Sequence, residues 1–203
     1  MTDTAALIAR FFDVIENDIA PKTRAGVRIG NKLFGAAILR KSDLSVIVAE
    51  TNNEIENPLW HGEMHAIKKL YELNRATLPE PSECIFLATH EPCSLCLSAI
   101  TWGGYDNFYY LFSHEDSRDS FAIPHDIRIL KEVFSVGEHA ADEPLYNRKN
   151  AFWESHNIGQ MIASLDRGNR EALLARLDDI GALYADLSAI YQASKGDKGI
   201  PLA

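Results

Sequence analysis

The sequence is organised around the segment THEPCSLCLSAITW, residues 89–102. Within it, Cys93 and Cys96 are three residues apart, so a helix places both sulfurs on one face, one turn from each other. Pro92 suits the first turn of such a helix, where the N–H that it lacks would have no partner. Cys93 would then lie at the positive end of the helix dipole, which favours its thiolate. We therefore predict a helix over residues 92–102 that presents two metal-binding thiolates.

A second segment, His61-Gly62-Glu63, stands at the expected start of another helix. One histidine and two cysteines form a zinc ligand set with one coordination position left open, as in a catalytic site. Glu63 can lean over that open position from the first helical turn. A carboxylate there could take a proton from water and return it to a leaving group. The two segments together predict a catalytic zinc held by His61, Cys93 and Cys96.

The flanking sequence alternates between strands and helices. Apolar runs at residues 33–39 and 44–49 read as an antiparallel hairpin, and residues 84–88 and 107–112 as further strands. Helices are expected over residues 5–19 (ended by Pro21), 61–74 and 127–134, and a later apolar stripe spans residues 173–191. The order predicts a mixed sheet covered by helices. On the helix that follows His61, the expected buried face is Met64, Ile67, Leu70 and Leu73.

The two metal-binding segments make the chain resemble the cytidine deaminase-like superfamily. The resemblance is carried by NPLWHGEMHAI (residues 57–67) and THEPCSLCLSAITW (residues 89–102), and the order of elements extends it over residues 5–111. It implies a three-layer α/β/α fold, with a mixed sheet between helices and a C-terminal helical extension. We expect a deaminase domain over residues 1–135, then a linker and helical extension over residues 136–203.

The resemblance also implies roles for individual residues. His61, Cys93 and Cys96 would bind Zn²⁺, and Glu63 would be the catalytic proton shuttle. Asn52 and Gly62 would contact the substrate, and Trp60 would narrow the pocket if its indole faces inward. His114 and Asp116 follow the strand expected to end near the site, where a solvated loop explains them equally well. Cys84, in an apolar strand, reads as a buried thiol.

The expected function is zinc-dependent hydrolytic deamination of a purine or pyrimidine nucleobase or small nucleoside, guanine- or cytosine-type, with release of ammonia. One alternative is a tRNA adenosine deaminase that uses the basic stretch of residues 22–41. Another is a non-catalytic binding module stabilised by zinc, for which His65 is the nearby candidate for a fourth ligand. A thiol redox protein is the third.

Charge and length limit the partners. The 203 residues carry 20 Lys+Arg and 29 Asp+Glu, so the net charge is 20 − 29 = −9. This charge disfavours a large nucleic-acid interface. The sequence contains no apolar run of the about 18 residues that a membrane span needs, and its first residues do not resemble a signal peptide. We expect a cytoplasmic homo-oligomer, a dimer, in which the stripe of residues 173–191 packs on the core or on a partner subunit.

Overall fold

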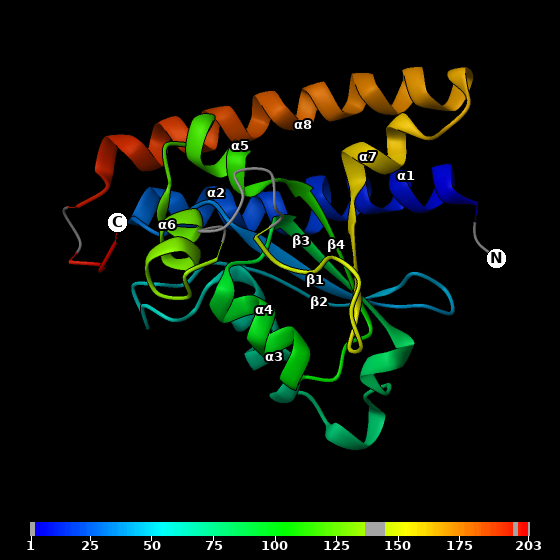
Figure 1. The fold of residues 1–203 in the computed structure, drawn as a ribbon, viewed down its shortest axis with the longest axis horizontal. Helices are drawn as coiled ribbons and strands as arrows, with labels where there is room; N and C mark the ends of the chain where they lie inside the picture. The colour runs from blue at the N-terminus through cyan, green and yellow to red at the C-terminus, as the bar shows by residue number, and fades with distance from the viewer. Residues whose placement is uncertain (1–2, 137–144, 197–198, 203) are drawn as a thin grey trace.

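Five strands form one mixed sheet in the order β2-β1-β3-β4-β5 (Figure 1). The computed structural model describes residues 3–136, 145–196 and 199–202. β1 pairs antiparallel with both β2 and β3, whereas β3–β4 and β4–β5 are parallel. The expected mixed sheet and the β1–β2 hairpin are confirmed. The strands are β1 Gly35–Arg40, β2 Val46–Thr51, β3 Cys84–His90, β4 Asn107–Phe112 and β5 Glu154–Asn157.

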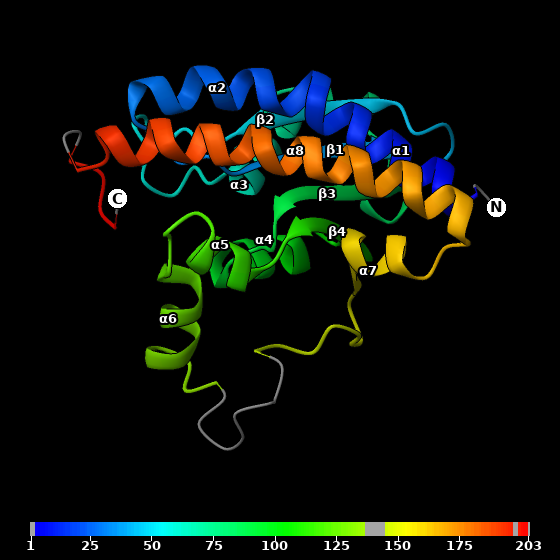
Figure 2. The same cartoon turned by 90° about the horizontal axis from the view of Figure 1, so that it is seen from above.

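Helices cover both faces of this sheet (Figures 1 and 2). One face carries α1, α2, α7 and the long α8, and the other carries α3 and α4. The three layers confirm the predicted α/β/α architecture. The α-helices are α1 Thr4–Val14, α2 Ala20–Ile29, α3 Gly62–Tyr71, α4 Ser94–Trp102, α5 His114–Asp119, α6 His125–Glu132, α7 Ile158–Ala163 and α8 Arg167–Ser194; Ile15–Ile19 is a π-helical turn, and Arg75–Thr77 and Pro81–Glu83 are 3₁₀ turns.

Side chains that alternate along the strands build two cores. On β3, Ile85 and Leu87 face the α1/α8 layer, and Phe86 and Ala88 face the α3/α4 layer. This follows from the two-residue period of a strand, which sends successive side chains to opposite faces. Cys84 lies in the α3/α4 core as a buried thiol, as expected.

Pro21 does not end the first helical segment. The chain passes from α1 through the π-helical turn Ile15–Ile19 directly into α2, where Pro21 occupies the first turn. A residue in the first turn of a helix needs no N–H donor, so proline is tolerated there. The helical segment ends instead at Gly30, whose φ of 109° suits a residue without a side chain.

The C-terminal portion adds elements that the sequence did not predict. β5 and α7 follow residues 137–144, which adjoin the expected domain boundary at residue 135 and lie outside the described part of the chain. The apolar stripe of α8 packs on the core of its own chain, with Leu173, Ile180, Tyr184 and Tyr191 buried. In the described residues, no helix is long and apolar enough to cross a membrane.

Acidic side chains pair with most of the basic stretch of residues 22–41. Each pair joins a basic residue of this stretch to a distant part of the fold, which fits a structural role for the stretch. The pairs are Lys22–Glu50, Arg24–Asp186, Lys32–Glu54 and Lys41–Asp106.

Arg176 joins α8 to α1, and we expect Arg176→Met to destabilise the protein by about 1–2 kcal/mol. Its guanidinium lies 2.5 Å from Asp13 and 2.6 Å from Glu16 and donates to the Ala9 carbonyl at 3.2 Å. Urea unfolding measures the loss. The matched control is Arg167→Met, because Arg167 forms an exposed pair within α8 and its loss should cost under about 0.5 kcal/mol. Equal effects of the two substitutions would contradict this role.

Candidate active site

His61 and Glu63 are placed by the beginning of α3. His61 is the residue before the first helical turn and has extended backbone angles, whereas Gly62 and Glu63 are helical. Gly62 packs tightly against β1, where a Cβ atom would lie 2.6 Å from the Gly35 Cα atom. The glycine therefore lets α3 approach the sheet closely enough to bury Glu63, which is 5% exposed.

The buried face of α3 differs from the expected one. Glu63, His65, Ala66 and Leu70 are buried, whereas Leu73, beyond the helix, is 45% exposed. Apolar periodicity predicts an interior of apolar side chains only. Here the helix instead directs a carboxyl group and an imidazole toward the sheet.

Cys93 and Cys96 lie at the beginning of α4 as predicted, but the helix starts at Ser94, so Pro92 lies just before it and not in its first turn. Cys93 precedes the first turn of the helix, and Cys96 lies within it. Both are buried, with exposures of 6% and 0%. The two sulfurs are 3.7 Å apart, and His61 Nδ1 lies 3.4 Å from Cys93 Sγ and 3.8 Å from Cys96 Sγ. The structure thus brings together the three predicted ligands, which come from two helices.

These spacings fit zinc. A tetrahedral ion with bonds of about 2.3 Å to sulfur and about 2.0 Å to nitrogen sets its ligand atoms about 3.6–3.8 Å apart. In the described residues, this is the one cluster of three His, Cys, Asp or Glu side chains with converging ligand atoms. Three protein ligands leave a fourth position for water or substrate, as in catalytic zinc sites.

The electrostatics of the cluster also favour a cation. A hydrogen bond from Cys96, aided by His61 and opposed by burial, holds the pKa of Cys93 well below its usual value. Burial opposes protonation of His61, but its contact with Cys93 prevails and raises the pKa of the imidazole to about 9. The pocket therefore holds negative charge that attracts a proton or a metal ion to His61.

Glu63 adjoins the ligands without belonging to them. Its Oε2 lies 3.3 Å from Cys96 Sγ. Burial, and then the charge of Cys93, raises the pKa of Glu63 to about 7. A carboxyl group of this kind can both accept and release a proton near neutral pH.

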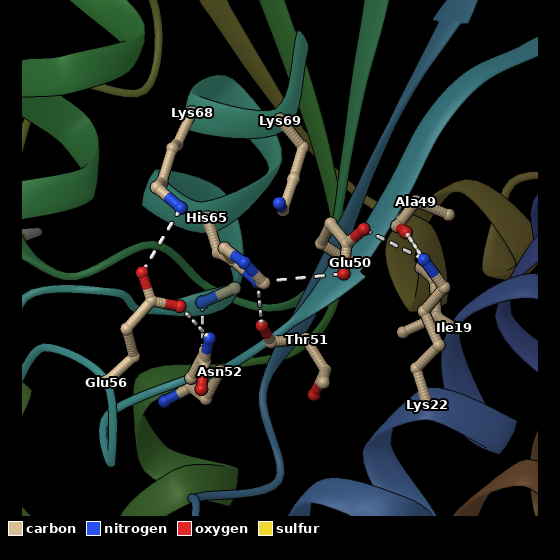
Figure 3. Close-up of polar contacts among 12 residues, drawn as sticks. Ile19, Lys22, Ala49, Glu50, Thr51, Asn52, Glu56, His65, Lys68 and Lys69 are labelled. Carbon is tan, nitrogen blue, oxygen red and sulfur yellow. Dashed lines mark hydrogen bonds and ion pairs between the residues drawn. The ribbon is translucent and has the colours of Figure 1, made fainter. Parts of the chain in front are cut away.

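Asn52 lies directly after β2 and joins this strand to α3 (Figure 3). Its Oδ1 accepts a hydrogen bond of 2.7 Å from the Gly62 N–H, one of the free donors at the start of α3. Its Nδ2 is buried and has no partner among the described residues. A buried amide donor without a partner is costly unless a ligand satisfies it.

His65 is not a metal ligand. Its Nδ1 donates to the Thr51 carbonyl at 2.9 Å and lies 3.6 Å from Glu50, as Figure 3 shows. The imidazole is buried and is directed toward β2. It therefore does not supply the fourth ligand of a structural zinc site.

A pocket of about 310 Å³ opens beside the ligands. This volume falls in the range of small-molecule sites, about 300–1,000 Å³. Its walls come from the segments before β1, after β2 and around α6, and from the end of the chain. They include Phe34, Leu59, His61, Cys93, Ile123, His125, Asp126, Ile129, Pro201 and Leu202.

None of the five predicted substrate contacts is among the residues that line this pocket. Asn52 and Gly62 bond to each other at the start of α3, and the other three contact other parts of the fold. Trp60 lies beneath Lys68, whose ammonium is 5.6 Å from the ring centroid. His114 is buried and its Nε2 donates to the Pro92 carbonyl at 3.1 Å. Asp116 bonds to the capping residue Ser113 of its own helix, so residues 114–119 form α5 rather than a loop at the site. The charged and aromatic character of these residues serves local structure.

The pocket also contains polar residues that no sequence motif indicates. Asp126, in the first turn of α6, shares the pocket with His61, and burial raises its pKa to about 6. Lys32 and Glu54 form a buried ion pair of 2.6 Å in the wall. Asp126 could not be singled out, because an acidic residue in a first helical turn is common. Lys32 and Glu54 lie far apart in sequence, so no local pattern indicated their pairing.

The comparisons with known proteins agree with this site. A family model described as the cytidine and deoxycytidylate deaminase zinc-binding region matches residues 16–112. The chain is 31% identical over 124 residues to guanine deaminase of Bacillus subtilis (strain 168), an alignment that covers 60% of this chain and 70% of the relative.

The chain belongs to the cytidine deaminase-like superfamily. It is a zinc-dependent hydrolytic deaminase that acts on nucleobases. An X-ray structure of guanine deaminase from Bacillus subtilis has the same fold as this deaminase, with 26% identity and a TM-score of 0.51. The superposition covers 68% of this chain and 86% of the other.

Proposed function

We propose that this deaminase converts free guanine and water into xanthine and ammonia. The observation that carries the proposal is the site itself: an open zinc ligand set, of which His61 and Cys93 line a pocket of small-molecule size, with the buried carboxyl group of Glu63 against Cys96 and an unpartnered amide donor on Asn52. The guanine deaminase relative, which shares 31% identity with this chain, supports guanine as the base. The net charge of −9 and the pairing of the basic stretch favour a small substrate over tRNA.

Glu63 is the proton carrier in this proposal. Zinc held by His61, Cys93 and Cys96 would supply a Lewis acid that makes water nucleophilic near neutral pH. Glu63 takes a proton from the attacking water and delivers it to the ring nitrogen beside the reacting carbon. It then takes the second proton of that water from the hydroxyl group now on the carbon and passes it to the amine as the C–N bond breaks and the C=O bond forms, so one water is consumed and one ammonia leaves. Its distance of 3.3 Å from Cys96 Sγ supports this role.

Asn52 and Gly62 are proposed to hold the base. The Gly62 N–H fixes the orientation of the Asn52 amide by donating to its Oδ1, so that Nδ2 is the group left to bond a substrate. Guanine offers carbonyl and ring-nitrogen acceptors for such a donor. Gly62 itself lets the backbone of α3 approach the sheet, which keeps Asn52 within reach of the helix N-terminus.

Asp126 is proposed to bind the departing amino group. Its carboxyl lines the pocket together with His61 and Cys93. A carboxylate accepts hydrogen bonds from an amine, and more strongly from an ammonium ion. This placement supports a role in releasing the product.

Replacing Asn52 by aspartate tests the base-binding role. We expect Asn52→Asp to lower kcat/KM by about 10–100-fold, because it removes the donor and sets an acceptor against the acceptors of the base. The matched control is Asn53→Ala, since the Asn53 side chain bonds only the exposed Glu56 among its described partners. Steady-state kinetics measures both variants. Full activity of Asn52→Asp, or equal losses in both, would contradict this assignment.

Substrate selectivity tests the proposed reaction. Purified protein is offered guanine, cytosine, adenine and guanosine, and the product is identified by chromatography against authentic xanthine. The proposal predicts that guanine has the highest kcat/KM and yields xanthine. A higher kcat/KM for cytosine or for a nucleoside would show that guanine is the wrong substrate while leaving a zinc deaminase in place.

The chain is also proposed to act in the cytoplasm as a homodimer. A reducing compartment keeps Cys93 and Cys96 as the free thiols that a metal site needs. Two large apolar side chains are exposed, Trp102 at 92% and Phe152 at 66%. A hydrogen bond from Trp153 to Thr101 joins the two segments that carry them, and these side chains are proposed to form the dimer contact. Sedimentation analysis tests the dimer, and a monomer at micromolar concentration would contradict it.

A further inference from the structure

The carboxylate of Glu91, two residues before Cys93, is held inside the protein by two hydrogen bonds and by the nearby side chains of Arg148 and His114, whose Nδ1 lies 3.6 Å from Oε2. Its side chain is 2% exposed. Oε2 accepts the backbone N–H of His114 at 2.9 Å, and Oε1 accepts the Tyr146 hydroxyl at 2.5 Å. Arg148 Nη2 lies 3.7 Å from Oε1. A buried carboxylate is costly without such partners, so these contacts determine where Glu91 can lie.

The backbone around Glu91 is fixed as well. The Glu91 N–H donates to the Phe112 carbonyl at 2.7 Å, and the Pro92 carbonyl accepts from His114 Nε2 at 3.1 Å. Pro92 adds the restriction of its own ring. The loop that leads into Cys93 is therefore tied to the end of β4 and the start of α5 by backbone and side-chain bonds together.

Tyr146 and Arg148 come from a part of the chain beyond residues 16–112, which the family model matches. The Tyr146 ring packs near Trp153 and His114, with centroid distances of 5.9 and 6.2 Å. Its hydroxyl is the atom that reaches the zinc-ligand loop. The C-terminal portion thus contacts the segment that carries Cys93, even though α8 lies on the opposite face of the sheet (Figure 2).

We infer that Glu91 and Tyr146 are positioning residues for the zinc ligand Cys93. By fixing the loop before Cys93, they hold its thiolate in the geometry that binds zinc and thereby slow zinc release. The inference rests on zinc binding by His61, Cys93 and Cys96, and it does not depend on which base is deaminated. Metal ligands need support from the groups around them, whose loss typically weakens metal affinity about 10–100-fold.

The rate of zinc release from the zinc-loaded protein tests this inference. A chromogenic chelator reports the rate at 25 °C. Tyr146→Phe keeps the ring and removes one hydroxyl, and we expect release about 10-fold faster than in wild type. The matched control is Tyr191→Phe, because the Tyr191 hydroxyl is buried without a partner among the described residues. Its release rate should stay within about twofold of wild type.

Two substitutions at Glu91 should accelerate zinc release to different extents. A glutamine can still accept from His114 N–H and donate to the Tyr146 hydroxyl, so Glu91→Gln should release zinc more slowly than Glu91→Leu, which leaves both groups unpartnered. Cobalt-substituted protein gives an independent readout, since its sulfur-to-metal absorption bands report the geometry at Cys93. We expect these bands to shift in Tyr146→Phe and to match wild type in Tyr191→Phe.

Three results would overturn the inference. The first is release from Tyr146→Phe within twofold of wild type, with an unchanged cobalt spectrum. The second is equal acceleration in Tyr191→Phe, which would reduce the effect to general loosening of the fold. The third is a wild-type protein that holds no zinc, which would also contradict the zinc site itself. Failure to turn over guanine in a zinc-loaded wild type would contradict only the proposed substrate, and the release rates would still decide the role of Glu91 and Tyr146.

Discussion

Glu63→Gln is expected to lower kcat by about 10²–10⁴-fold while the protein keeps one zinc per chain. Glutamine has nearly the shape of glutamate and preserves packing at this buried position, but it cannot carry a proton. Glu63 is not among the three converging ligand atoms, so the metal should remain. Steady-state kinetics and metal analysis of the same sample measure the two quantities.

The control for this substitution is Glu72→Gln, at the opposite end of α3, where the carboxylate is half exposed and pairs with Lys68 and Lys69. It should leave kcat unchanged. A Glu63→Gln variant that retains zinc and more than about a tenth of wild-type kcat would contradict the assignment of Glu63 as the proton carrier.

Cys96→Ala is expected to abolish both zinc binding and activity. The substitution removes one of three ligands at a fully buried position, and we expect kcat/KM to fall by at least about 1,000-fold, the several kcal/mol that a Lewis acid contributes. The zinc-free protein should also unfold at lower temperature, because a metal that binds only the folded state stabilises it.

The control here is Cys84→Ala, which removes a buried thiol outside the ligand cluster. It should keep one zinc per chain and near-wild-type activity, at a modest loss of stability from the small cavity. Treatment of wild type with a chelator should reproduce the Cys96→Ala phenotype, and re-addition of zinc should reverse it only in wild type. Activity of the zinc-free wild type would contradict the account.

The zinc ligand set could be predicted because its elements are local. Cys93 and Cys96 are three residues apart at the beginning of one helix, although this helix starts two residues later than the predicted position of Pro92. The hairpin β1–β2 and strand β4 were predictable for a similar reason: each is a short apolar run bounded by polar residues. Asn52 followed from the family resemblance, and the unpartnered amide that supports its role became visible only in the structure.

The pocket walls could not be predicted, because they depend on contacts between distant segments. Asp126 reaches the pocket only because α6 packs beside α4, and the Lys32–Glu54 pair joins two loops that flank the hairpin. Residue type alone also gave wrong predictions. Trp60 and His114 were expected to contact the substrate, but the Trp60 ring lies against the Lys68 ammonium and His114 bonds to the Pro92 carbonyl.

The apolar stripe of α8 was recognised, but its partner surface was not. Periodicity identifies a buried face without saying what covers it, and α8 packs against α1 and α2 of its own chain. The residues that reach the pocket from this end are Pro201 and Leu202, beyond the helix. Nothing in the sequence around Pro201 and Leu202 indicates that these residues line the pocket.

The release of ammonia from guanine by protein with one bound zinc per chain tests the central claim most directly. The account predicts one ammonia and one xanthine for each guanine consumed, with activity lost on zinc removal and restored when zinc is returned. No ammonia from guanine, cytosine, adenine or their nucleosides, with zinc shown to be bound, would contradict it.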